Sequence, residues 1–239
     1  FKIGRADCIV LRTASHTVVI DAGEEDDGAE IVSYLKEHKI TTVDKLIITH
    51  FDSDHIGGAA ALLDYAAVGE VLIPSYTKGS STYRRFATAM ETAGIQPTAL
   101  TEKLTFELDR TQYTVYPPAR SSYPNNEDNE YSLIVGITHG ENRFLFAGDA
   151  LTERLREFTA LDEGKYDFLK VSNHGDYFEG VEAFSQAVSP TYAVITCSDK
   201  NPADARTVAA LEAVGARVYL TRNGSVKVTS DGQTISVLQ

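Results

Sequence analysis

The chain has 239 residues, with 22 Lys and Arg against 34 Asp and Glu, so its formal net charge is −12 at pH 7. That length is sufficient to bury a full hydrophobic core, and no apolar run approaches the roughly 20 residues that cross a bilayer, so no membrane span is predicted. The acidity excludes a protein that binds nucleic acid mainly through a basic face, because phosphate neutralisation needs clustered Lys and Arg.

The first half of the chain alternates strand and helix patterns. Ile31, Tyr34 and Leu35 recur at helical spacing and indicate an amphipathic helix, whereas short apolar runs between turn residues indicate strands. In chain order the predicted elements are strands at 8–13 and 17–21, a helix at 30–38, a strand at 45–49, a helix at 59–67, a strand at 71–74 and a helix at 83–93.

The second half repeats this alternation after strands at 104–108 and 112–116 and a polar loop at 117–129. The elements that follow are strands at 131–138 and 143–147, a helix at 151–158, a strand at 168–171, a helix at 181–188, a strand at 192–197, a helix at 203–214 and strands at 217–221, 226–229 and 234–237. Two mixed sheets packed together with helices outside are the natural layering, so the predicted fold is α/β (α+β), a four-layer αββα sandwich. No linker rich in Gly or Ser separates the halves, so 1–239 is expected to form one domain.

A cluster of metal-ligating residues follows the strand at 45–49. His50, Asp52, Asp54 and His55 fall within six positions, and two glycines then allow a tight turn into the next helix. In an extended segment the first three would project to the same side. Asp54 also suits a helix N-cap, but imidazoles and carboxylates gathered at a strand end favour a metal site.

Two later strand ends carry residues of the same kind. Asp149 follows a glycine after a buried strand, where its carboxylate could bridge two cations, and His174 stands before a glycine after another strand. Each alone is also compatible with a helix cap or a turn. Together with the first cluster they predict a binuclear metal site.

On these motifs the chain resembles the metallo-β-lactamase fold superfamily, and specifically the branch similar to the hydrolase domain of the DNA-uptake protein ComEC. The superfamily pattern His-x-His-x-Asp-His is matched from His50 to His55, with Asp52 replacing the second His as in that branch. Later motifs of the branch are matched by the residues 129–132, 148–149 and 174–175. The resemblance also implies that Asp21, in an early Asp-x-Gly turn, supports the metal loop from behind the ligands.

The resemblance implies two divalent metal ions, zinc or manganese. One ion is expected to be held by Asp54, His55, Asp149 and His174. The other is expected to be held by His50, Asp52 and Asp149, with water, Asn129 or Ser132 on the substrate side completing it. Asp54 is also expected to act catalytically by orienting the attacking water.

The activity that the resemblance implies is hydrolysis of an anionic phosphoester of the phosphodiester type, with nucleic acid among the candidates, by hydroxide formed at the metal ions. Two departures from the family pattern weaken a strict nuclease assignment, because no histidine follows Asn129 and none stands near Asn201. Another ester or amide hydrolase of this fold and a non-catalytic metal-binding module remain alternatives. No protein partner is predicted.

The remaining features leave alternatives open. A group after the strand at 71–74 could contact phosphates or stack on bases, but a solvated loop and helix face is the favoured interpretation; its members are Tyr76, Lys78, Tyr83, Arg84 and Arg85. No function is assigned to His16, His38 or His139. Cys8 and Cys197 are expected to be buried thiols, with a disulfide between them undecided. The first residue is not methionine, which favours a secreted or cell-surface protein over a cytoplasmic one, although a truncated chain explains it equally well.

Overall fold

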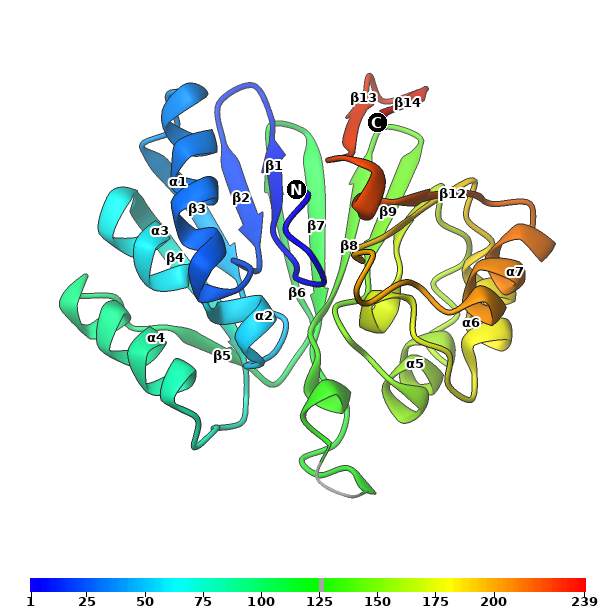
Figure 1. Ribbon diagram of the computed structural model, residues 1–239, viewed down its shortest axis with the longest axis horizontal. Coiled ribbons are helices and arrows are strands. Elements are labelled where there is room, and N and C mark those ends of the chain that lie inside the picture. The colour runs from blue at the N-terminus through cyan, green and yellow to red at the C-terminus, as the bar shows by residue number, and fades with distance from the viewer. Residues whose placement is uncertain (125–126) are drawn as a thin grey trace.

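The computed structural model describes residues 1–124 and 127–239 and arranges them in four layers (Figure 1). Two β-sheets lie face to face, and helices cover the outer face of each. The predicted four-layer αββα sandwich is therefore confirmed. The predicted loop at 117–129 includes residues 125–126, which lie outside the described residues. Among the described helices, none is long and apolar enough to span a membrane.

The first sheet is built mainly from parallel strands joined by crossover helices. Its strands stand in the order β1 (Ile9–Arg12), β2 (Thr17–Ile20), β3 (Thr42–Ile47), β4 (Ala67–Pro74) and β5 (Thr98–Leu100). Only β1 and β2 pair antiparallel, since parallel neighbours need a long connection. The connections carry α1 (Gly28–Glu37), α2 (Ser53–Ile56), α3 (Ala59–Tyr65) and α4 (Ser81–Thr92).

The second sheet joins an antiparallel half to a parallel half. Its order is β12 (Arg217–Leu220), β11 (Tyr192–Ile195), β10 (Phe168–Lys170), β9 (Asn142–Phe146), β8 (Ile134–His139), β7 (Thr111–Tyr116) and β6 (Leu104–Leu108). Strands β6 to β9 pair antiparallel, and β9 to β12 pair parallel. The helices between the parallel strands are α5 (Thr152–Thr159), α6 (Val181–Val188) and α7 (Ala205–Ala213), and a hairpin of β13 (Lys227–Ser230) and β14 (Ile235–Leu238) follows.

Side-chain alternation along the strands builds the layers. In β2, Val18 and Ile20 enter the core between the two sheets, whereas Val19 between them enters the core under the helices of the first sheet. Ile47 in β3 joins the inner core and Leu46 beside it joins the outer one. Such strands are buried on both faces, which is why they read as continuous apolar runs.

The two cysteines lie in separate cores. Cys8 packs in the outer core of the first sheet, and Cys197 packs in the outer core of the second. Both are buried free thiols, so the expected burial is confirmed and no disulfide joins them.

The layering brings the carboxyl ends of central strands from both sheets to one edge of the sandwich. The backbone N–H of Leu133, just before β8, donates to the carbonyl of Thr49, just after β3, at 2.9 Å. The N–H of Asn173, after β10, donates to the carbonyl of Gly148, after β9, at 3.2 Å. Segments far apart in sequence are thereby fixed against one another where polar side chains leave the strands.

Two sequence-based expectations about local structure were wrong. The segment after His50 is not extended throughout, because Asp52 takes the N-cap position of α2 and Asp54 lies inside that helix. The extended geometry from which His50, Asp52 and Asp54 were expected to project to one side is therefore not present. The strand expected to start at 131 begins only at Ile134, since 128–131 form a turn of 3-10 helix. The three-residue β5 was not predicted.

Gly57, which ends α2, has no space for a side chain. A Cβ there would lie 2.3 Å from the backbone N of Glu25 and 2.6 Å from the carbonyl O of Ser53. We expect Gly57→Ala to lower the free energy of unfolding by about 1–3 kcal/mol, because forced overpacking shifts backbone. A Cβ at Gly79 would meet no atom within 4 Å, so Gly79→Ala is the control. Urea unfolding midpoints measure both variants, and equal midpoints would contradict the packing argument.

Candidate metal centre

Four side chains converge at the edge of the sandwich where the strand ends meet. They offer two imidazole nitrogens and two carboxylate oxygens within 4.8 Å of one another, and they are Asp54, His55, Asp149 and His174. The first two belong to α2 behind β3, the third follows β9 and the fourth follows β10. Three of these side chains are buried, whereas Asp54 keeps 22% of its side chain exposed, so the group opens to solvent on its side.

The ligand atoms of this group are spaced as they would be around one cation. His174 Nε2 lies 3.0 Å from Asp149 Oδ2 and 3.2 Å from Asp54 Oδ2. His55 Nε2 lies 3.4 Å from Asp149 Oδ1 and 3.4 Å from His174 Nε2. Ligands of a tetrahedral zinc ion, each ~2.1 Å from the metal, stand ~3.4 Å apart. Asp149 Oδ1 is buried and accepts no hydrogen bond from any described residue, so the group fits a divalent cation.

Hydrogen bonds on the far side of each imidazole direct the Nε2 lone pairs into the group. His55 Nδ1 donates to Asp21 Oδ2 at 2.8 Å, because a carboxylate can only accept. His174 Nδ1 donates to Thr196 Oγ1 at 2.9 Å, and that hydroxyl donates to Asp7 Oδ1 at 2.7 Å. Both histidines are thus held in the tautomer that a metal ligand requires.

Charges in the group are arranged in opposing pairs. Burial opposes a charge on His55, but the carboxylates of Asp149 and Asp21 outweigh it and raise the pKa of His55. Burial also penalises the Asp149 carboxylate, yet the two neighbouring imidazoles, His174 and His55, hold the pKa of Asp149 well below its usual range. A carboxylate that stays ionised in a buried site is available to a cation at neutral pH.

The backbone of the ligand loops departs from regular structure. Asn173 and His174 both adopt left-handed conformations, with φ of 45° and 51°. Gly148, with φ of 53°, lies so close to Thr49 that a Cβ would be 2.9 Å from the Thr49 Cβ. Non-glycine residues in this region cost of order 1–3 kcal/mol each and concentrate at functional sites. The conformation turns the His174 ring back toward the strand ends.

The residues expected to hold a second cation are not brought together in the same way. His50 is fully buried, and its Nε2 has no hydrogen-bond partner among the described residues. That nitrogen lies 3.8 Å from Asp52 Oδ2, but in the described part of the chain the pair has no third His, Cys, Asp or Glu within ligand distance. Lys78 forms an ion pair with Asp52 Oδ1 instead.

Asn129 and Ser132, expected on the substrate side, lie at the turn before β8. Ser132 is buried, and its Oγ accepts the backbone N–H of Asp149 at 3.3 Å, so it supports the Gly-Asp turn. Asn129 Oδ1 is buried and has no hydrogen-bond partner among the described residues. Asp21 lies behind His55, and its Oδ1 and Oδ2 also accept the Thr49 N–H and O–H, each at 2.7 Å.

Sequence reasoning missed an ion pair beneath the group. Lys170, the last residue of β10, is buried and its ammonium pairs with Asp7 Oδ2 and lies 3.7 Å from Asp149 Oδ1. Burial disfavours the charge on Lys170, but Asp7 and Asp149 raise the pKa of this ammonium. A lone Lys inside an apolar strand and a lone Asp just before one were the available signals. A second group, formed by Asp7, Asp21 and His55, lies behind the centre. Its two carboxylates already have partners, because Thr49 donates to Asp21 and Lys170 pairs with Asp7.

Removing the support behind His55 should weaken metal binding without removing a ligand. We expect Asp21→Asn to reduce the affinity for a divalent cation about 10–100-fold, as is typical when the partner of a ligating histidine is changed. Asp44→Asn is the matched control, because Asp44 also accepts a backbone N–H, from Thr17 at 2.8 Å, but belongs to no ligating group among the described residues. Competition with a chromophoric chelator measures both affinities, and an unchanged value for Asp21→Asn would contradict this role.

Breaking the buried ion pair between Lys170 and Asp7 should lower the free energy of unfolding. In the presence of a chelator, Lys170→Met leaves Asp7 buried without its cation and should lower the free energy of unfolding by about 3–5 kcal/mol. Lys45→Met removes a partly exposed pair with Glu70 and should cost about 1 kcal/mol or less. Urea unfolding compares the two, and similar losses would show that the Lys170 pair is not the stronger constraint.

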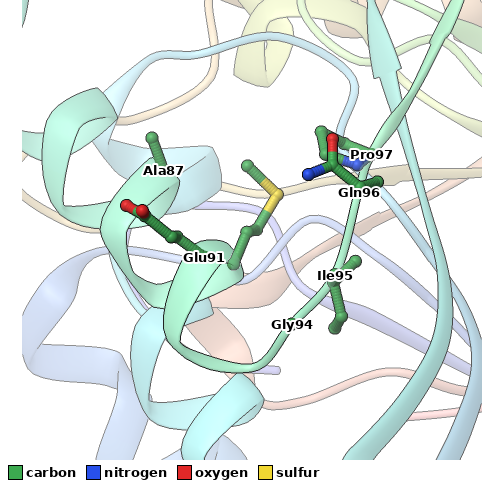
Figure 2. Close-up of a pocket in the computed structure, with 7 residues that line it drawn as sticks. Ala87, Glu91, Gly94, Ile95, Gln96 and Pro97 are labelled. Atoms are coloured by element: carbon green, nitrogen blue, oxygen red, sulfur yellow. The ribbon is translucent and has the colours of Figure 1, made fainter.

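A hollow of about 310 Å³ lies elsewhere, where α4 ends and the chain turns toward β5 (Figure 2). Its lining is Ala87, Met90, Glu91, Gly94, Ile95, Gln96 and Pro97. Glu91 is the one ionisable side chain in this lining. The hollow therefore does not coincide with the four-residue group.

Comparison with known proteins identifies the family. The model of the metallo-beta-lactamase superfamily matches residues 2–198. The chain is 31% identical over 173 residues to Recombination protein 2 of Haemophilus influenzae, covering 72% of this chain and 20% of that protein. It is 27% identical over 172 residues to ComE operon protein 3 of Bacillus subtilis, covering 72% of this chain and 22% of that protein. The metallo-beta-lactamase fold protein YhfI of Bacillus subtilis superposes with a TM-score of 0.61 at 11% identity, covering 93% of this chain and 95% of that one.

The chain belongs to the metallo-β-lactamase superfamily, as its motifs predicted. Its curated relatives place it in the ComEC-like branch. The chain spans about a fifth of the length of the two relatives named above. The likeness to YhfI shows the fold alone, and it agrees with the four layers described above.

Proposed function

We propose that the chain is a metal-dependent hydrolase that cleaves phosphodiester-type substrates, nucleic acid among them. The observation that carries the proposal is the group of Asp54, His55, Asp149 and His174, in which both Nε2 atoms lie close together beside a carboxylate oxygen that has no hydrogen-bond partner among the described residues. We propose zinc or manganese as its cation, because two imidazoles and two carboxylates suit zinc and also admit a harder ion.

Asp54, His55, Asp149 and His174 would hold a divalent cation, which would supply Lewis acidity for activating a water molecule and stabilising negative charge at the phosphoryl centre. The chain supplies the remaining functions. His55 and His174 are held in one tautomer by Asp21 and Thr196. Asp54 is the partly exposed member of the group, so its carboxylate can orient a water molecule and accept its proton.

Cationic side chains flank the group and support an anionic substrate. Arg5 donates to Asp176 Oδ1 at 3.1 Å and keeps 29% of its side chain exposed. The negative charges of Asp149 and Asp54 favour its charged form. Lys78 pairs with Asp52, two residues before Asp54, and its side chain is 24% exposed. Phosphate oxygens are favourable partners for both cations. The similarity to Recombination protein 2 and ComE operon protein 3 favours nucleic acid within this substrate class.

The test begins with protein purified without chelators, its metal content measured by mass spectrometry. We expect about one bound divalent ion in the four-residue group and turnover of bis-p-nitrophenyl phosphate. His174→Ala should lose the ion and lower kcat/KM by at least about 100-fold, because one of four ligands and its charge balance are removed. His16→Ala is the control, since His16 pairs with Asp109 outside the group and should leave both quantities unchanged.

The substrate class is tested by parallel assays. Single-stranded oligonucleotide, bis-p-nitrophenyl phosphate and p-nitrophenyl acetate separate nuclease, small-diester and carboxylester activity. Preference for acetate over both phosphodiesters would replace the proposal with another hydrolase of this fold. Bound metal with no turnover of any of the three would identify a metal-binding module.

A further inference from the structure

Lys78 lies beside Asp52, one of the residues that were expected to hold a second cation. It lies in the connection between β4 and α4, and its Nζ pairs with Asp52 Oδ1 and with Asp128 Oδ2, the latter at 2.6 Å. Asp52 comes from the metal loop of the first sheet, and Asp128 from the turn before β8 of the second sheet. The ammonium therefore joins two carboxylates across the seam between the sheets.

The carboxylate of Asp52 is engaged on both oxygens. Oδ1 is held by Lys78, and Oδ2 faces His50 Nε2 at 3.8 Å. A divalent cation between His50 and Asp52 would lie close to the ammonium, where the two positive charges repel at short range. The set also lacks a further imidazole, because position 129 is Asn and position 132 is Ser.

Packing holds the Lys78 segment in place. The backbone N–H of Phe51 donates to the Tyr76 hydroxyl at 2.9 Å, two residues before Lys78. The Tyr76 ring stacks on Tyr131 with centroids 4.6 Å apart, and Tyr131 belongs to the same turn as Asp128. Both neighbours of the ammonium are thus fixed to the segment that carries it, so Lys78 is a built part of the site rather than a free surface lysine.

We propose that the Lys78 ammonium takes the place of the second cation, so that this chain holds one divalent ion in the group of Asp54, His55, Asp149 and His174. Lys78 then supplies a fixed positive charge beside Asp52, whose other carboxylate oxygen faces His50. This inference rests on the proposed metal centre and is independent of the substrate.

The experiment is a metal titration of the whole chain with Mn²⁺ alone, read by equilibrium dialysis and by electron paramagnetic resonance. The unaltered chain should bind one equivalent and give the spectrum of an isolated Mn²⁺ ion. Lys78→Met removes the ammonium and keeps the aliphatic stem, and it should bind a second equivalent and give the signature of two coupled ions. Lys78→Gln, measured in parallel, should behave in the same way.

The control variant is Lys227→Met, on β13 at the opposite end of the sheets from α2 (Figure 1). Lys227 is exposed, and this variant should bind one equivalent. Two coupled equivalents in the unaltered chain, or one equivalent in both Lys78 variants, would overturn the inference while leaving the metal-dependent hydrolase intact. No bound Mn²⁺ in any variant would overturn the inference together with the proposed centre. One equivalent without hydrolysis would overturn the proposed activity and uphold this inference.

Discussion

A single buried carboxylate, that of Asp7, joins the parts of the site that come from distant strands. Its Oδ2 pairs with the Lys170 ammonium on β10, and its Oδ1 accepts from Thr196 after β11. Its backbone N–H donates to the carbonyl of Asp54 at 3.0 Å, which ties α2 to the same point. A buried charge is tolerated only when it is paired and hydrogen-bonded, so these segments must dock together or leave Asp7 uncompensated.

Hydrogen bonds behind the imidazole rings fix the orientation of the histidines. Asp21 and Thr196 differ in charge, yet each fixes one imidazole through Nδ1 and leaves Nε2 free. Thr49 extends the pattern, because its hydroxyl donates to Asp21 and lies 3.1 Å from His50 Nδ1. Three histidines on two sheets are therefore oriented by Asp21, Thr196 and Thr49, which lie behind the imidazole rings.

The sequence predicted those parts of the candidate site that depend on patterns of neighbouring residues. Asp149 and His174 could be assigned because each follows a buried strand and stands beside glycine, and parallel strands end at one edge. The helical turn of α2 was missed because four residues show no periodicity, so the segment that carries Asp54 was expected to be extended. The contacts of Lys78 with Asp128 and of Lys170 with Asp7 join residues 50 and 163 positions apart, and no local pattern encodes such pairs.

The uneven burial of the four residues of the candidate centre would also govern how fast a cation exchanges. Three side chains are closed off by the sheets and only Asp54 reaches solvent. An ion held by these four residues would therefore leave past the Asp54 carboxylate. Exchange with a chelator would then depend on the motion of a single side chain on a four-residue helix, and slow loading would follow from the burial of the other three side chains.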